Sequence, residues 1–176
     1  GDRIFGGTGN DVVDGLAGDD CIDLGPGTDH GQGGIGNDLI LGGLGADRMD
    51  GSSGNDGMRG GSSADRLNGG FGDDRLHGQS GKDRISGSGG RDRINGGSSN
   101  DVISAGSSND RVAGDQGGDR INGNSGSDVL KGNSGDDRIS ARDGRRDRVS
   151  CGSGRDVVVA DRSDRVARDC ERVRRR

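Results

Sequence analysis

Apolar and polar residues along this chain follow a period of nine. Between residues 6 and 140 the eighth position of each nonapeptide is Val, Ile, Leu or Met in fourteen of fifteen units, and only Gly31 interrupts the pattern. The residues on either side are mostly polar, which is the alternation of a short strand with one buried face. One such strand cannot bury enough surface to fold alone, so each unit must stack on its neighbours. The pattern therefore predicts an all-β repeat protein.

Two nonapeptides are expected to close one coil, each contributing a six-residue turn and a three-residue strand. Glycine fills the first position in thirteen of the fifteen units and the fourth in twelve, where it would supply the positive φ of tight turns. Stacked coils, spaced by about 4.8 Å, would give eight layers and a flattened cylinder of roughly 40 Å. The inward side chains would form two ladders, one of Ile22, Ile40, Met58, Leu76, Ile94, Val112 and Leu130, the other of Val13, Met49, Leu67, Ile85, Ile103, Ile121 and Ile139.

Composition alone would suggest a disordered chain, because only 24% of the 176 residues are hydrophobic and 41 are glycine. The strict period favours a solenoid instead. Of the 30 acidic residues 29 are Asp and only Glu171 is Glu. A merely solvated acidic surface would use both types, so the preference for the short carboxylate indicates a geometric requirement.

An aspartate recurs every nine residues from Asp2 to Asp137, at the sixth position of each unit. Aspartates two units apart, such as Asp20 and Asp38, would lie one coil apart, where two bare carboxylates repel by several kcal/mol at an effective dielectric of about 20. A divalent cation removes this repulsion, and Ca²⁺ takes six to eight oxygens from carboxylates and carbonyls. Mg²⁺ demands a tighter octahedron, and the His and Cys ligands of zinc do not recur with the period. The ladder therefore predicts multiple calcium ions.

A metal-free alternative exists, in which each aspartate only caps its turn by accepting hydrogen bonds from backbone N–H groups. Asparagine would serve that purpose equally well, but it never occupies the sixth position. The alternative is therefore the weaker of the two interpretations.

The consensus Gly-Gly-x-Gly-x-Asp-x-(apolar)-x, best seen in Gly6–Asp14, resembles the RTX or haemolysin-type calcium-binding repeat over roughly residues 2–158. The resemblance implies a parallel β-roll, a two-sheet right-handed β-solenoid, with Ca²⁺ between turns on both edges. It also implies secretion and folding in extracellular calcium. The metal ligands it implies are Asp11, Asp20, Asp29, Asp38, Asp47, Asp56, Asp65, Asp74, Asp83, Asp92, Asp101, Asp110, Asp119, Asp128, Asp137 and Asp156, with the carbonyls of Gly6, Thr8, Gly33, Ile35, Gly42 and Leu44.

Some units depart from the consensus. Leu24, Pro26 and Gly31 fall within one unit, so both its turn and its strand are expected to be irregular. Ser63, Ser99 and Ser108 replace the fourth-position glycine, at a cost of about 1 kcal/mol each if φ is positive. We expect the coils with these departures to bind calcium more weakly, or only when neighbouring sites are filled.

The register changes after residue 140. This divides the chain into a repeat domain, 1–140, and an Arg-rich C-terminal cap, 141–176, with 12 basic and 7 acidic residues. Cys151 and Cys170 lie 19 residues apart, close to one coil, so we predict a disulfide and an oxidising compartment; two free thiols are the alternative. Cys21 has no evident partner.

Arginine occupies the seventh position in eight of the fifteen units. These outward side chains would either be a solvated face that discourages sheet association or an adhesive surface for a polyanion such as a cell-surface polysaccharide. No enzyme is expected, because His30 and His77 are the only histidines and no catalytic motif accompanies them. Nothing indicates a nucleic-acid partner or a transmembrane segment. The favoured prediction is a structural, secreted calcium-binding module of a longer protein.

Overall fold

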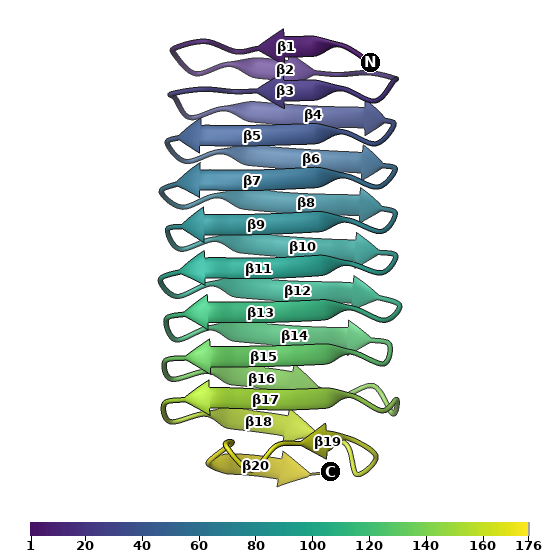
Figure 1. Ribbon diagram of the computed structural model, residues 1–176, viewed down its shortest axis with the longest axis vertical. Helices are drawn as coiled ribbons and strands as arrows, with labels where there is room; N and C mark the ends of the chain where they lie inside the picture. The colour runs from purple at the N-terminus through teal and green to yellow at the C-terminus, as the bar shows by residue number, and fades with distance from the viewer. Residues whose placement is uncertain (176) are drawn as a thin grey trace.

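Two parallel β-sheets, packed face to face, make up the computed structural model, which describes residues 1–175 (Figure 1). Each sheet has ten strands, and each strand pairs with the next but one in sequence. The register advances by one coil per strand, so that Ile85 pairs with Ile103 and Ile103 with Ile121. The predicted all-β, two-sheet solenoid is confirmed. No helix in the described residues is long and apolar enough to cross a membrane.

The odd-numbered strands form the first sheet and the even-numbered strands form the second. The first sheet contains β1 (Arg3–Phe5), β3 (Cys21–Asp23), β5 (Leu39–Leu44), β7 (Gly57–Ser62), β9 (Arg75–Ser80), β11 (Arg93–Ser98), β13 (Arg111–Gln116), β15 (Val129–Ser134), β17 (Arg148–Ser153) and β19 (Arg165–Val166). The second contains β2 (Val12–Asp14), β4 (His30–Ile35), β6 (Arg48–Ser53), β8 (Arg66–Phe71), β10 (Arg84–Gly89), β12 (Val102–Ser107), β14 (Arg120–Ser125), β16 (Arg138–Ala141), β18 (Val157–Ala160) and β20 (Arg172–Arg175).

The strands are longer than the sequence pattern suggested. The expected length of three residues holds for β1 to β3, but from β4 to β15 every strand has six. The first three positions of each unit remain hydrogen-bonded to the coils on either side, which leaves turns of only three residues, such as 54–56. The molecule also has ten strands per sheet where eight coils were expected, because residues before Gly6 and after Ser140 add strands to both sheets.

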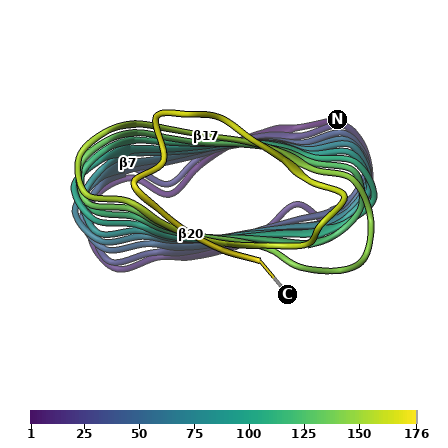
Figure 2. The ribbon, with the colours of Figure 1, turned by 90° about the horizontal axis from the view of Figure 1, so that it is seen from below.

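The core is a narrow column between the two sheets. Seen along the long axis, the coils superpose as a flattened ring whose long sides are the sheets and whose short sides are the turns (Figure 2). Both predicted apolar ladders point inward, and every member except Val13 is at most 3% exposed. Gly31 leaves no hole, because the methyl groups of buried Leu24 occupy that space, 3.1 Å from where a Cβ of residue 31 would lie. The expectation of an irregular strand here was wrong, since β4 is a full six residues.

The glycine positions need one correction. Positive φ occurs at the second and fourth positions of the units, not at the first. The first position is glycine for lack of space, because a Cβ at Gly33 would collide with the carboxylate of Asp38. The three serines at the fourth position do adopt positive φ, at 83° for Ser63, 84° for Ser99 and 85° for Ser108.

The sheets continue beyond the change of register. β17 pairs with β15 and β18 with β16, so the units after residue 141 still form coils. Cys151 on β17 forms a disulfide with Cys170 just before β20, with a Cα–Cα distance of 5.1 Å. The predicted bridge is confirmed and the alternative of two free thiols is wrong. Cys21 is half-buried and has no disulfide partner among residues 1–175.

Candidate metal centre

A row of buried aspartates runs along each turn edge of the solenoid. The sixth-position aspartates stand at the end of each turn, immediately before the next strand, as Asp56 does before β7. From Asp20 to Asp137 each is at most 3% exposed. Carboxylates are rarely buried to this extent unless they are paired or bind a metal.

One oxygen of each carboxylate caps the preceding coil. Oδ1 of Asp38 accepts a hydrogen bond from the backbone N–H of Asp20 at 2.8 Å, and Oδ1 of Asp56 accepts one from Asp38 at 2.8 Å. The series continues to Oδ1 of Asp137, which accepts from Asp119 at 2.8 Å. Backbone capping, the metal-free alternative, is therefore present, but it accounts for only one of the two oxygens.

The other oxygen, Oδ2, is buried and accepts no hydrogen bond from the described residues. This holds for Asp11, Asp20, Asp29, Asp38, Asp47, Asp56, Asp65, Asp74, Asp83, Asp92, Asp101, Asp110, Asp119, Asp128, Asp137 and Asp156. A buried acceptor without a partner costs about 1–3 kcal/mol, and more when it is charged. Both rows repeat this free-energy cost along the length of the solenoid.

Burial also makes these carboxyl groups difficult to ionise. Desolvation is the largest effect and raises the pKa of Asp65, Asp74, Asp101 and Asp110 to about 7, although the backbone hydrogen bond to each opposes it. The neighbouring carboxylates one coil away raise these pKa values further. Each row thus lacks the positive charge that would stabilise its ionised form.

The unsatisfied oxygens converge with backbone carbonyls. A Cβ placed on Gly15 would lie 2.8 Å from Oδ2 of Asp20 and 2.5 Å from the carbonyl oxygen of Gly33 in the next coil. The same pairing of oxygens surrounds Gly42, where Asp47 Oδ2 and the Gly60 carbonyl meet. Only oxygens contribute, which suits a hard cation such as Ca²⁺ better than zinc. The residues present fit calcium.

The proposed carbonyl ligands are not equivalent. Ile35 and Leu44 use their carbonyls as acceptors for the backbone N–H groups of Gly18 and Gly27, both at 2.8 Å. Each keeps its second lone pair for a cation. The carbonyl of Gly33 faces Gly15 in the preceding coil. Gly6 and Thr8 belong to the first coil, where Thr8 is exposed.

The row extends past the change of register, which the nine-residue period missed. Asp147 is 1% exposed and its Oδ1 accepts from the N–H of Asp128 at 2.8 Å; Asp164 does the same for Asp147 at 3.0 Å. Glu171 closes the other edge by accepting from Asp156 at 2.8 Å. The signal in the sequence was the valine two residues after each Asp, at Val149 and Val166.

A second ladder, also missed, runs beside the first. At the fifth position, Oδ1 of Asp19 accepts from the N–H of Asn37 at 2.7 Å, and Oδ1 of Asn37 accepts from Asn55 at 2.9 Å. These bonds run in the opposite direction, from the later coil to the earlier one. Where a hydrogen-bond acceptor is all that is needed, Asn and Asp therefore interchange. The sixth position never contains Asn, which indicates that more than a hydrogen-bond acceptor is needed there.

Comparison with known protein families agrees with this geometry. The model of the RTX calcium-binding nonapeptide repeat, in four copies, matches residues 1–30, 25–58, 59–94, 86–121, 113–146 and 122–158. No curated protein shows significant similarity to the chain. RTX repeats in a β-roll suggest calcium binding and a structural role. Because the matches cover nearly all of the repeat region, the chain belongs to the RTX calcium-binding nonapeptide repeat family.

Proposed function

We propose that calcium ions bind between the turns on both edges of the solenoid and that their binding drives its folding. The observation that supports this most strongly is the row of buried Oδ2 atoms without hydrogen-bond partners. Ca²⁺ supplies the charge that these oxygens lack, and the sixth-position carboxylates with the turn carbonyls hold it. Asp147 continues the buried row and its capping hydrogen bond, whereas Asp156 also has a buried Oδ2 without a partner and belongs to the ligand set.

Energetics explain why folding and binding are coupled. Sixteen buried Oδ2 atoms at about 1–3 kcal/mol each outweigh the 5–15 kcal/mol by which typical domains are stable. The narrow apolar column has little reserve to offset them. The ligand set exists only in the folded coil, so calcium binds the folded state and stabilises it.

Circular dichroism of the full chain tests this proposal. In the far ultraviolet at pH 7.5, we expect β structure in millimolar calcium and its loss on addition of a chelator. Magnesium at the same concentration is the control, and it should restore much less signal because it prefers a smaller octahedral site. A β spectrum that persists unchanged in chelator at pH 7.5 would refute calcium-driven folding.

We further propose that the β-roll is a structural module of a secreted protein. The disulfide Cys151–Cys170 fits an oxidising compartment, and extracellular fluids supply millimolar calcium, the range in which extracellular modules bind it. Residues 141–176 would close the C-terminal end of the module as a cap. The bridge between β17 and the segment before β20 supports this assignment.

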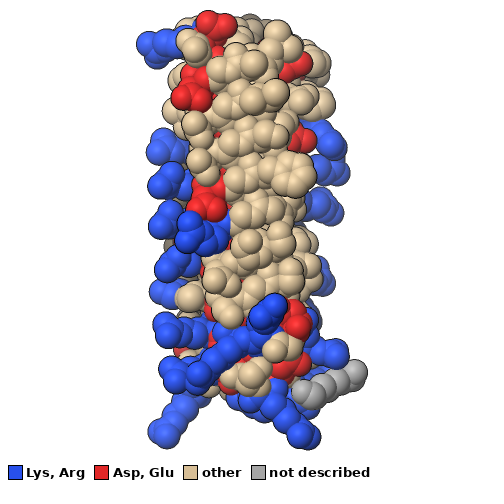
Figure 3. Space-filling view, turned by 90° about the vertical axis from the view of Figure 1, so that its right-hand side faces the viewer, with Lys and Arg blue, Asp and Glu red and all other residues tan. Residues whose placement is uncertain are grey.

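Adhesion to a polyanion is a second candidate, favoured by the outward arginines. Arg75, Arg93 and Arg111 are exposed and directly in register on the first sheet, and Figure 3 shows basic side chains in columns on either side of one turn edge. Calcium-loaded protein should then be retained on heparin, and the R75Q/R93Q/R111Q variant should elute earlier. Wild-type protein that flows through would refute this candidate.

A further inference from the structure

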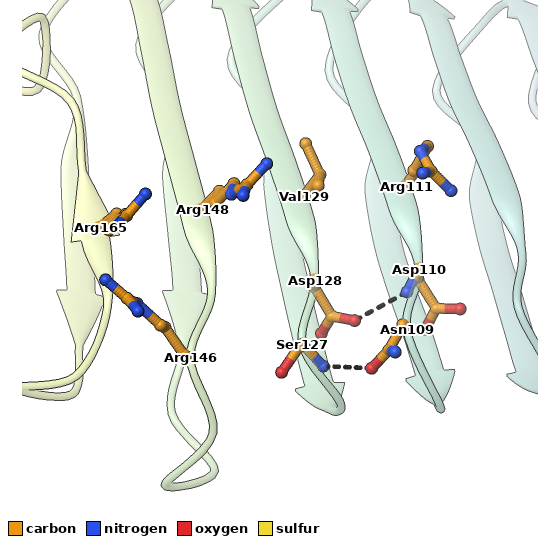
Figure 4. Close-up of a pocket in the computed structure, with 9 residues that line it drawn as sticks. All are labelled: Asn109, Asp110, Arg111, Ser127, Asp128, Val129, Arg146, Arg148 and Arg165. Atoms are coloured by element: carbon orange, nitrogen blue, oxygen red, sulfur yellow. Dashed lines mark hydrogen bonds between the residues drawn. The ribbon is translucent and has the colours of Figure 1, made fainter.

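A hollow on the first sheet lies near its C-terminal end. It has a volume of about 470 Å³, within the range of small-ligand pockets. Figure 4 shows Arg146, Arg148 and Arg165 on one side of Val129 and Arg111 on the other. We call this hollow the arginine pocket.

Two irregularities of the repeat create the arginine pocket. In the seventh position, Arg111, Val129, Arg148 and Arg165 follow one another in register, and the short valine leaves a gap between long neighbours. Asp147 follows Asp137 by ten residues instead of nine. The extra residue widens the turn after β16 and places Arg146 beside the gap. The arginine pocket thus lies where the nine-residue period is interrupted.

Four arginines line this pocket, and none of them forms an ion pair within residues 1–175. Among the residues that the structure describes, the ion pairs are Arg91–Asp73 and Arg155–Asp136, and neither involves the pocket. Asp110 and Asp128 lie at its base, but each is only 1% exposed, and Oδ1 of Asp128 accepts the N–H of Asp110 at 2.8 Å. Their carboxylates belong to the buried row.

The second sheet carries a similar hollow with a different charge balance. Arg138, Val157 and Arg172 repeat the same register there around a volume of about 370 Å³. In that hollow Arg155 is paired with Asp136 at 3.0 Å, and Glu171 lines the wall. The same framework is thus neutralised on one sheet and left positively charged on the other.

We propose that the arginine pocket binds a sulfate or phosphate ester group carried on a sugar. Guanidinium forks match the oxygens of such groups in bidentate geometry and stay charged at all physiological pH values. Four arginines against two lining aspartates leave a formal charge of +2, which matches one dianion, and Ser127 adds a hydroxyl to the lining. The volume exceeds what a bare ion fills, which leaves room for part of the sugar ring.

Titration calorimetry of the full chain in saturating calcium tests this proposal. The probes are a sulfated disaccharide, the same disaccharide without sulfate, and inorganic sulfate. We expect the sulfated disaccharide to bind one site with an affinity at least tenfold above that of its unsulfated form. Tighter binding of the disaccharide than of inorganic sulfate identifies the sugar-borne group as the ligand, and equal affinity overturns the role of the sugar.

Matched variants locate the site. R146Q/R148Q should weaken binding of the sulfated disaccharide at least tenfold, whereas R138Q/R172Q, which removes the same charge from the second-sheet hollow, should change it less than twofold. Equal loss in both pairs would mean diffuse attraction to a basic surface and would overturn the proposal, as would no binding by the wild type. The calcium-induced circular dichroism change, measured on each variant, shows that it folds and separates this result from the calcium proposal.

Discussion

Two adjacent turn positions use a similar hydrogen bond for different purposes. Asn100 at the fifth position accepts the N–H of Gly118 at 2.8 Å, and Asp101 at the sixth accepts the N–H of Asp83 at 2.8 Å. Only Asp101 also has a buried second oxygen without a partner. At the residue scale, that oxygen separates a capping side chain from a proposed calcium ligand.

Asp101→Asn should therefore act in opposite directions with and without calcium. The amide keeps the capping oxygen but removes a charge from the cation, so we expect the variant to lose about 1.5–3 kcal/mol of stability in saturating calcium. In chelator the variant should keep at least as much residual β structure as wild type, because it no longer buries a carboxylate. Urea unfolding in calcium measures the first value, and the circular dichroism spectrum in chelator checks the second.

Asn100→Asp is the matched control, because it makes the reverse change one residue away on an exposed side chain. Its stability in calcium should stay within about 0.5 kcal/mol of wild type. If both substitutions cost the same amount in calcium, the sixth-position aspartate would be a hydrogen-bonding cap and nothing more.

At the scale of a single element, β4 shows how a coil tolerates a missing core residue. Gly31 replaces the apolar side chain of its strand, and Leu24, in a position normally held by glycine, fills the space from the preceding strand connection and is fully buried. The two departures from the repeat compensate each other, because the side chain of Leu24 occupies the core space that residue 31 leaves empty.

Leu24→Gly should open a cavity and destabilise the calcium-loaded protein by about 3–5 kcal/mol. Gly31→Ile alone should also destabilise it, since a Cβ there meets the Leu24 methyl groups at 3.1 Å. The double variant restores the consensus, so most of the loss should be recovered. Chemical denaturation of all three variants yields the coupling energy between positions 24 and 31. Additive losses would contradict the compensation between the two residues.

At the scale of the whole molecule, the two carboxylate rows make calcium-free stability depend on pH. The pKa of Asp65, Asp74, Asp101 and Asp110 is about 7 in the folded chain, against an ordinary value of 3.8. The folded state thus holds more protons than the unfolded state. Its stability from these groups is greatest below pH 3.8 and is lost as the pH rises toward 7.

Calcium-free protein should consequently gain β structure on acidification from pH 7.5 to about 5, in 0.15 M salt to screen the arginines. Protonation then takes the place of calcium in removing the buried charge, so folding should need less added calcium as the pH falls over that range. Circular dichroism titrations at several pH values measure both trends. A calcium midpoint independent of pH between 5 and 7.5 would contradict the raised pKa values.

Much of this molecule was predictable from its sequence because the same residue types recur at the same positions of nearly every unit. Fourteen apolar eighth-position residues and the unbroken aspartate series defined the coil, the core ladders and the candidate ligands. The spacing of Cys151 and Cys170 predicted their bridge in the same way. Because two units form one coil, residues two units apart in the sequence lie next to each other in neighbouring coils.

Features that depend on contacts between different units became visible only in the tertiary structure. The space that excludes a Cβ at Gly33, and the methyl groups of Leu24 beside Gly31, belong to packing between units. The period could not reveal that Asp147 continues the buried row, because one inserted residue hid it. The same insertion, together with Val129, placed unpaired arginines around one hollow. Periodicity determines what repeats, whereas three-dimensional contacts determine what happens where the repeat fails.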